Sequence, residues 1–296
     1  MTLGYYPGCT LKSHARNLED SAIEALKVLG VETVELERWN CCGAVYSLAD
    51  DDLIHQLAPV RDLIRAKDMG LDKVMTLCSM CYNTLARANL LMRNDEAKRK
   101  TLNDFMEEES DYAGEVEVIH LLQFLKNDIG WDKLKAAVKV PLKDLNLSPY
   151  YGCTLTRPLE VSIDEAVSPT IFKEFIEALG GTYIHSDHSA ECCSSYQMIS
   201  NPEAAIEAAS KVVRSAEDQG ADALALSCPL CEYNLGKRQV DILKKHDDLK
   251  PLPTFYFSQL LAVALGVDPL ICRFELNPTA SLELLEEKGV VEKVSA

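Results

Sequence analysis

The feature that most limits the fold of this chain is a cysteine pattern that occurs twice. In each copy a single cysteine is followed, about 30 to 40 residues later, by an adjacent pair and then, after a similar gap, by C-x-x-C. The first group is Cys9, Cys41, Cys42, Cys78 and Cys81, and the second is Cys153, Cys192, Cys193, Cys228 and Cys231. The neighbouring residues repeat as well, since "YYPGCTL" at 5–11 matches "PYYGCTL" at 149–155. Such self-similarity indicates a duplication. We therefore expect two units, 1–145, with a helical linker from about residue 95, and 146–296.

Within each copy, short apolar runs alternate with longer stretches of helical periodicity. The stretch "NLEDSAIEALKVLG" has apolar residues at helical spacing, and "LDKVMTLC" reads as a buried strand that leads into C-x-x-C. Strands that alternate with helices predict an α/β fold with parallel pairing. We expect two small Rossmann-like units, each a short parallel sheet with flanking helices. Each cysteine group follows an expected strand, so a metal site is expected at the carboxyl ends of the strands.

The charge balance argues against nucleic acid and membrane partners. The 296 residues include 46 Asp and Glu against 30 Lys and Arg, a net charge of -16, which repels phosphate backbones and anionic lipids. No apolar run approaches the roughly 20 residues that cross a bilayer, and the first residues do not resemble a signal peptide. A cytoplasmic protein is expected.

In a reducing compartment, cysteines at patterned spacings are more often metal ligands or redox groups than structural disulfides. A four-cysteine zinc site would leave one cysteine of each group idle. A cubane iron-sulfur cluster also needs only four thiolates. The adjacent pair is used most simply by a cluster with widely spread irons. The spacing therefore favours iron-sulfur over zinc but leaves both open. Cys272 stands outside both groups and is expected to be a buried apolar side chain.

The duplicated pattern with its adjacent pair resembles the cysteine-rich CCG domain, and two such domains in one chain resemble the B subunits of heterodisulfide reductases. The resemblance covers nearly the whole chain. It implies that each unit binds a noncubane [4Fe-4S] cluster through its five cysteines, and that the chain reduces the coenzyme M-coenzyme B heterodisulfide to two thiols. It further implies that a ferredoxin-like C subunit donates electrons, with a flavin-containing A subunit and a hydrogenase or formate dehydrogenase module behind it. The chain itself shows no G-x-G-x-x-G after a strand and no phosphate loop, so no flavin or nucleotide is expected here.

An anionic substrate on an acidic protein requires local cations. Candidate substrate-binding residues are the basic residues that follow the cysteine motifs: Lys12, His14, Arg16, Arg87, Arg157 and Lys237. Lys12 and Arg16 would share a helix face if a helix begins that early. His185 and His188 precede the second pair and are weaker candidates for proton donation.

One departure separates the two copies, because Ser194 stands where the first copy has Gly43. Serine adopts a tight left-handed turn only with strain, so the two pockets are not expected to be identical. This departure keeps an alternative function open. The chain would then serve for electron transfer within another CCG oxidoreductase, of the thiol:fumarate reductase, lactate-oxidising or sulfur-oxidising type, with zinc or a different cluster in one unit.

Overall fold

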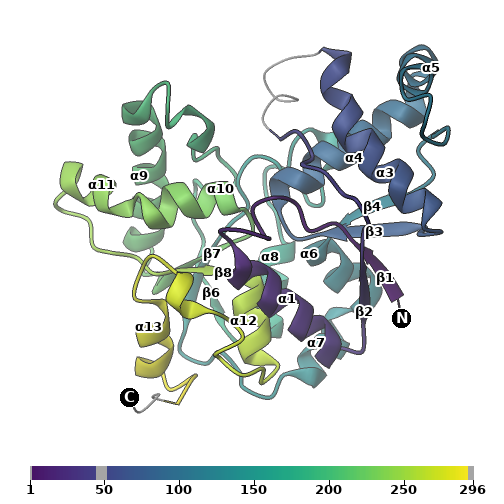
Figure 1. The fold of residues 1–296 in the computed structure, drawn as a ribbon. Coiled ribbons are helices and arrows are strands. Elements are labelled where there is room, and N and C mark those ends of the chain that lie inside the picture. Colours follow the sequence, from purple (N-terminus) through teal and green to yellow (C-terminus); the bar gives the residue numbers. More distant parts are fainter. Residues whose placement is uncertain (1, 45–51, 293–296) are drawn as a thin grey trace.

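The computed structural model describes residues 2–44 and 52–292, which form two four-stranded sheets (Figure 1). The first sheet contains β1 (Thr2–Tyr5), β2 (Glu32–Glu35), β3 (Lys73–Thr76) and β4 (Glu117–His120). The second contains β5 (Asn146–Tyr150), β6 (Thr182–Tyr183), β7 (Ala223–Leu226) and β8 (Thr254–Tyr256). The strand orders are β2-β1-β3-β4 and β6-β5-β7-β8, and every pairing is parallel. The predicted duplication of an α/β unit with a parallel sheet is confirmed.

The helices provide the crossovers between parallel strands. In the first unit they are α1 (Arg16–Val28), α3 (Leu57–Asp68), α4 (Ser79–Asn94), α5 (Glu96–Phe105), α6 (Leu121–Phe124), the π-helical turn η2 (Leu125–Ile129) and α7 (Trp131–Ala137). In the second they are α8 (Ile171–Ala178), α9 (Pro202–Asp218), α10 (Pro229–Glu232), the π-helical turn η5 (Tyr233–Lys237), α11 (Gln239–Lys245), α12 (Phe257–Ala264) and α13 (Ser281–Glu287). Short 3-10 turns complete the chain: η1 (Leu53–Gln56), η3 (Leu159–Val161), η4 (Ser195–Gln197) and η6 (Phe274–Leu276).

The sequence predicts the strands that precede the cysteine motifs but not the fourth strand of each unit, β4 and β8. Both are short, and β4 follows a polar segment that was expected to be a linker. Their burial is nevertheless high, because β8 is fully buried and the last two residues of β4 are buried. Parallel strands covered by helices on both faces are held mainly by such apolar packing, which short sequence patterns reveal poorly.

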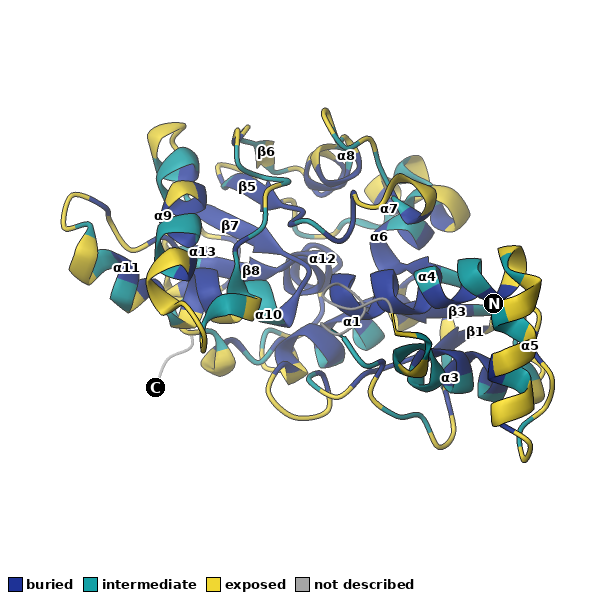
Figure 2. Ribbon diagram, turned by 90° about the horizontal axis from the view of Figure 1, so that it is seen from above, coloured by how far each residue is buried: buried dark blue, intermediate teal, exposed yellow. Residues whose placement is uncertain are grey.

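At the boundary between the units, the helix after the first strand of one unit packs against the helix after the last strand of the other unit. Helix α1, which follows the first strand of unit one, lies against α12, which follows the last strand of unit two. Helices α8 and α6 repeat this pairing in the opposite sense. The elements between the sheets are mostly buried (Figure 2). Polar contacts fix the α1–α12 pairing, since Ser21 Oγ lies 2.7 Å from Ser258 Oγ and Asn17 donates to Asn277 over 2.9 Å.

The units differ in two added segments. In unit one, α5 and the chain up to residue 116 stand before β4, whereas in unit two a long segment, 154–170, connects β5 to α8. The second segment is attached to the first unit, because Asn83 of α4 donates to the carbonyls of Thr154 (2.8 Å) and Arg157 (2.7 Å). Tyr82 Oη likewise donates to the carbonyl of Val161 over 3.0 Å. The loop that follows Cys153 is therefore positioned by both units.

Candidate metal centre

The structure brings the five cysteines of each group together at the carboxyl ends of the strands. In unit one, Cys9 Sγ lies 3.7 Å from Cys41 Sγ, and Cys42 Sγ lies 3.6 Å from Cys81 Sγ. Unit two repeats the arrangement, since Cys192 lies close enough to Cys153, and Cys231 close enough to Cys193, to shift the pKa of that thiol.

The two groups also meet each other. Cys78 is the N-cap residue of α4 and Cys228 is the N-cap residue of α10, and the nearby Cys228 thiol raises the pKa of Cys78. Beside them, Ser79 Oγ lies 2.6 Å from Ser227 Oγ, and the Ser79 amide donates to the Ser227 carbonyl over 3.3 Å. The two sulfur groups are thus neighbours across the boundary between the units.

A tyrosine latch holds each cysteine pair near the end of the first strand. Tyr6 Oη donates to the carbonyl of Asn40 over 2.7 Å, and Tyr150 Oη donates to the carbonyl of Glu191 over 2.6 Å. Asn40 and Glu191 each directly precede a cysteine pair, so the two latches are equivalent. Both hydroxyls are buried, and burial raises their pKa values, which keeps them as neutral donors.

Asn40 of unit one and the matching Glu191 of unit two have different side-chain partners. Asn40 donates its amide N–H to Asp62 Oδ1 over 2.8 Å, and its side-chain amide donates to Asp62 Oδ2 over 3.2 Å. Burial raises the pKa of Asp62 to about 8. Glu191, by contrast, is exposed and its carboxylate lies 2.9 Å from His188 Nδ1.

The turn after each cysteine pair is left-handed in both units. Gly43 has φ +74° and Ser194 has φ +58°, and the amide of Ser194 donates to Cys192 Sγ over 3.3 Å. A Cβ at Gly43 would meet nothing closer than 3.7 Å. A serine at Gly43 would therefore also fit the space, and Ser194 bears the conformational cost of the left-handed region, about 1 kcal/mol.

The thiol pKa values reflect sulfur-to-sulfur hydrogen bonding. Such bonds hold the pKa values of Cys42, Cys193 and Cys228 below the usual range and that of Cys192 at about 6. They raise the pKa values of Cys41, Cys78, Cys81, Cys153 and Cys231. In each group some sulfurs become thiolates at the expense of their neighbours, because thiolates in contact repel one another. A bound cation removes this conflict.

The donor set fits a soft metal. Each group offers five sulfur atoms, and thiolates favour zinc and iron-sulfur clusters. The surroundings are tightly built, because a Cβ at Gly8 would lie 3.0 Å from Cys81 Sγ, and at the equivalent Gly152 it would lie 3.5 Å from Cys231 Sγ. In the described part of the chain, no three His, Cys, Asp or Glu side chains surround a single point closely enough to hold one metal ion. The sulfurs instead form a string of neighbours.

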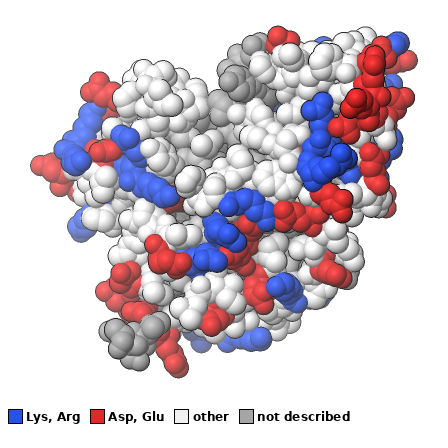
Figure 3. Space-filling view, in the orientation of Figure 1, with Lys and Arg blue, Asp and Glu red and all other residues white. Residues whose placement is uncertain are grey.

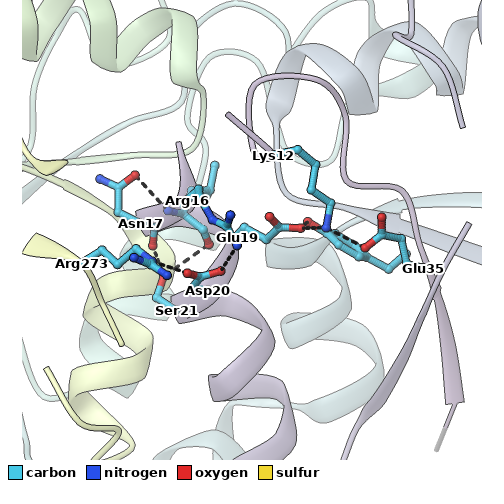
Figure 4. A network of polar contacts seen from close by, with 10 residues as sticks. Lys12, Arg16, Asn17, Glu19, Asp20, Ser21, Glu35 and Arg273 are labelled. Atoms are coloured by element: carbon cyan, nitrogen blue, oxygen red, sulfur yellow. Dashed lines mark hydrogen bonds and ion pairs between the residues drawn. The ribbon is translucent and has the colours of Figure 1, made fainter. Parts of the chain in front are cut away.

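The predicted basic residues have different surroundings. Lys12 does not lie in a helix, because α1 begins at Arg16, and its Nζ lies 2.6 Å from both Glu19 Oε1 and Glu35 Oε2 (Figure 4). Arg16 and Arg273 both contact Asp20. Figure 3 shows basic and acidic side chains interspersed on this face.

The other candidates lie apart from this network. His14 is exposed in a turn, Arg87 lies on α4 and Lys237 ends η5. Burial raises the pKa of Glu232 to about 7, and the positive charge of Lys237 partly offsets this rise. Arg157 lines a pocket of about 590 Å³ together with Cys153. His185 Nε2 lies 3.0 Å from Asp187, and both residues are exposed. Cys272 is fully buried, as expected, and burial raises its pKa to about 12.

Sequence reasoning missed the residues that join the units: Ser79, Ser227, Tyr82 and Asn83. Their positions beside or within the C-x-x-C motifs were visible, but their partners lie in the other copy. It also missed Lys173, which shares a pocket with Arg157 and lies far from any cysteine in the sequence.

Comparisons with known proteins match this geometry. The model of the cysteine-rich domain CCG matches residues 3–86 and 148–236. The chain is 31% identical to the membrane anchor subunit of the 8-methylmenaquinol:fumarate reductase of Wolinella succinogenes, over 89% of this chain and 92% of that protein. It is 29% identical to the B subunit of the ferredoxin/F420H2-dependent CoB-CoM heterodisulfide reductase of Methanosarcina acetivorans, over 96% and 95% of the two chains.

A crystal structure of a hypothetical protein from Helicobacter pylori shares the fold. It has a TM-score of 0.76 and 14% identity, over 94% of this chain and 52% of that chain. Among the described residues, no helix is both long and apolar enough to cross a membrane.

Proposed function

Because the chain belongs to the family of CCG cysteine-rich domain proteins, which includes B subunits of heterodisulfide reductases, we propose that it is the disulfide-reducing component of such a complex. The proposed substrate is the coenzyme M-coenzyme B heterodisulfide. The observation that carries the proposal is that the two cysteine groups meet at the unit boundary, where Ser79 Oγ, next to Cys78, lies 2.6 Å from Ser227 Oγ, next to Cys228. Reduction of a disulfide needs two electrons and separates two sulfur atoms, and two adjacent centres match both requirements.

We propose two noncubane [4Fe-4S] clusters as the cofactors. Cys9, Cys41, Cys42, Cys78 and Cys81 would hold one, and Cys153, Cys192, Cys193, Cys228 and Cys231 the other. When bound, the clusters would supply the electrons for cleavage of the disulfide. The five-sulfur donor set of each group supports this assignment, because thiolates are the usual ligands of iron-sulfur clusters.

The chain's own residues hold and shape the site. The two tyrosine latches fix the cysteine pairs, and Asn83 fixes the loop that carries Cys153 and Arg157. Lys12 and Arg16 are engaged by carboxylates, so they are weaker candidates for substrate binding than Arg157. His14, Arg87 and Lys237 stay candidates.

Electrons would come from partner proteins. We propose a ferredoxin-like C subunit and a flavin-containing A subunit, with a hydrogenase or formate dehydrogenase module beyond. Two relatives that match almost their whole length to this chain are themselves components of larger reductases, which supports an assembly of several proteins.

The decisive experiment measures iron, zinc and sulfide in the anaerobically purified chain, and then its turnover of the heterodisulfide with a reduced viologen as donor. About eight irons per chain, no zinc, and release of both thiols are expected, since two four-iron clusters are proposed. Zinc in one unit, or iron without disulfide turnover, would overturn the proposal.

One observation favours a second candidate. The 31% identity to a component of a fumarate reductase supports an electron-transfer role in a quinol-linked complex. In that case partner proteins would reduce and reoxidise the iron centres. Addition of the heterodisulfide or of its thiols would leave the spectra of the iron centres unchanged.

A further inference from the structure

The pocket beside Cys153 combines a cysteine thiol with a cation. It is lined by Cys153, Thr154, Arg157, Pro158, Leu159 and Ala166, and has a volume of about 590 Å³. None of these six lining residues carries a carboxylate. Sites with mostly apolar walls and few convergent polar groups are typical of small-molecule binding.

A second pocket of about 570 Å³ continues from Arg157 and adds Lys173 to the lining. Arg157 donates one Nη1–H to the carbonyl of Ala190 over 2.9 Å. Lys173 Nζ lies 5.8 Å from the centre of the Tyr183 ring. Within 2–44 and 52–292, neither cation lies within ion-pair distance of a carboxylate. The two carboxylates of this pocket, Asp187 and Glu191, are engaged by His185 and His188.

The first unit differs in this respect. Its basic residues after Cys9 are neutralised, Lys12 by Glu19 and Glu35 and Arg16 by Asp20. An anion that approaches Lys12 and Arg16 therefore meets a charge-balanced network. Near Cys153 it meets a guanidinium with donors still available for a planar or tetrahedral anion.

Arg157 is also held in place. Its own carbonyl accepts from Asn83 of the other unit, and Tyr82 holds Val161 at the end of the same loop. Such support limits the side-chain positions that binding must select, which lowers the entropic cost of recognition.

We propose that the pocket at Cys153 is an anion subsite, in which Arg157 contacts the charged end of one half of the disulfide while Lys173 extends the site. The inference rests on the proposed function and deepens it. The two halves of the substrate are bound differently. The half in which a short chain separates the anionic group from the sulfur atom binds to the second unit.

The test compares two thiols of similar length on the metal-loaded full chain. Calorimetric titration measures the dissociation constants of 2-mercaptoethanesulfonate, which is anionic, and of 2-mercaptoethanol, which is neutral. We expect the anionic thiol to bind at least about tenfold more tightly, as expected for one charge-assisted contact. Arg157→Gln should reduce this preference to about twofold or less, Arg157→Lys should keep part of it, and Lys173→Gln should lower it moderately.

The control is Lys100→Gln on α5, which removes an exposed cation that pairs with Asp104 and should leave the preference unchanged. Metal content and unfolding temperature are measured for each variant, so that a misfolded protein is recognised. Equal binding of both thiols by the native chain, or a preference that survives Arg157→Gln, overturns the subsite and leaves the proposed function intact. If neither thiol binds, methanesulfonate is titrated. Methanesulfonate binding that depends on Arg157 then supports the anion subsite and counts against the heterodisulfide as the substrate. If methanesulfonate does not bind either, both the anion subsite and the proposed function are overturned.

Discussion

Ser79 Oγ and Ser227 Oγ lie 2.6 Å apart, in a fully buried contact that joins the two C-x-x-C motifs across the unit boundary. Replacement of either serine by alanine leaves the other hydroxyl buried without this partner, which costs about 1–3 kcal/mol. The double variant should cost less than the sum of the single variants. Chemical unfolding of all four proteins measures this coupling. Strict additivity would show that the contact contributes nothing.

Gly8→Ala should remove the metal of the first unit. The added Cβ would lie 3.0 Å from Cys81 Sγ at a residue with φ +74°, so the sulfur must move. Gly30→Ala is a matched control, because φ is +76° and the Cβ meets nothing within 4 Å. Both variants should lose about 1 kcal/mol of stability from the left-handed backbone. Only Gly8→Ala should lose about half the iron per chain, measured by mass spectrometry of the metals, since one of two proposed clusters is affected. Equal iron in the two variants would contradict the role of Cys81.

His120 should make stability depend on pH. Its Nδ1 accepts from the Leu122 amide over 3.2 Å and its Nε2 lies 3.0 Å from the Leu77 carbonyl, while burial lowers its pKa from 6.5 to about 4. Since the unfolded chain takes up a proton between pH 6.5 and 4 and the folded chain does not, stability is complete above pH 6.5 and falls towards pH 4. The loss amounts to about 3 kcal/mol.

Denaturant unfolding at several pH values measures this effect. His120→Asn should flatten the profile between pH 4 and 6.5. An unchanged slope in His120→Asn would assign the pH dependence to other groups.

Lys12→Met should destabilise the chain without changing metal content. Glu19 is buried and accepts from Tyr5 Oη over 3.1 Å, and Lys12 is its cationic partner. Because the lysine side chain is 35% exposed, solvent screening limits the cost to about 1–2 kcal/mol. Lys27→Met is the comparison, since this exposed lysine pairs only with Glu24 in the described structure, and it should cost less than about 0.5 kcal/mol. Similar losses in both variants would show that Glu19 does not need Lys12.

The sequence predicted the duplicated α/β architecture and the gathering of each cysteine group, because repeated motifs and strand ends are local features. It did not predict which cations are available. Lys12 is neutralised by Glu35, which comes from an adjacent strand, and Arg157 is positioned by Asn83, which comes from the other unit. Contacts between distant segments depend on how the units pack, and no periodicity in the sequence encodes that. The fourth strands were missed for a related reason, since three or four residues carry too weak a pattern.

The packing of α1 on α12 and of α8 on α6 bears on the symmetry of the two units. In the interface of a two-fold symmetric homodimer, each element of one copy contacts a second element of the other copy, and the same contact occurs with the copies reversed. The two helix pairs follow this rule. The arrangement is thus that of such a dimer with both copies in one polypeptide. In a homodimer every substitution appears twice, so a neutralised Lys12 beside one centre and an available Arg157 beside the other require the fusion. In a single polypeptide the surroundings of the two cysteine groups can differ, and they do differ, because Lys12 is paired with Glu35 while Arg157 donates to a backbone carbonyl.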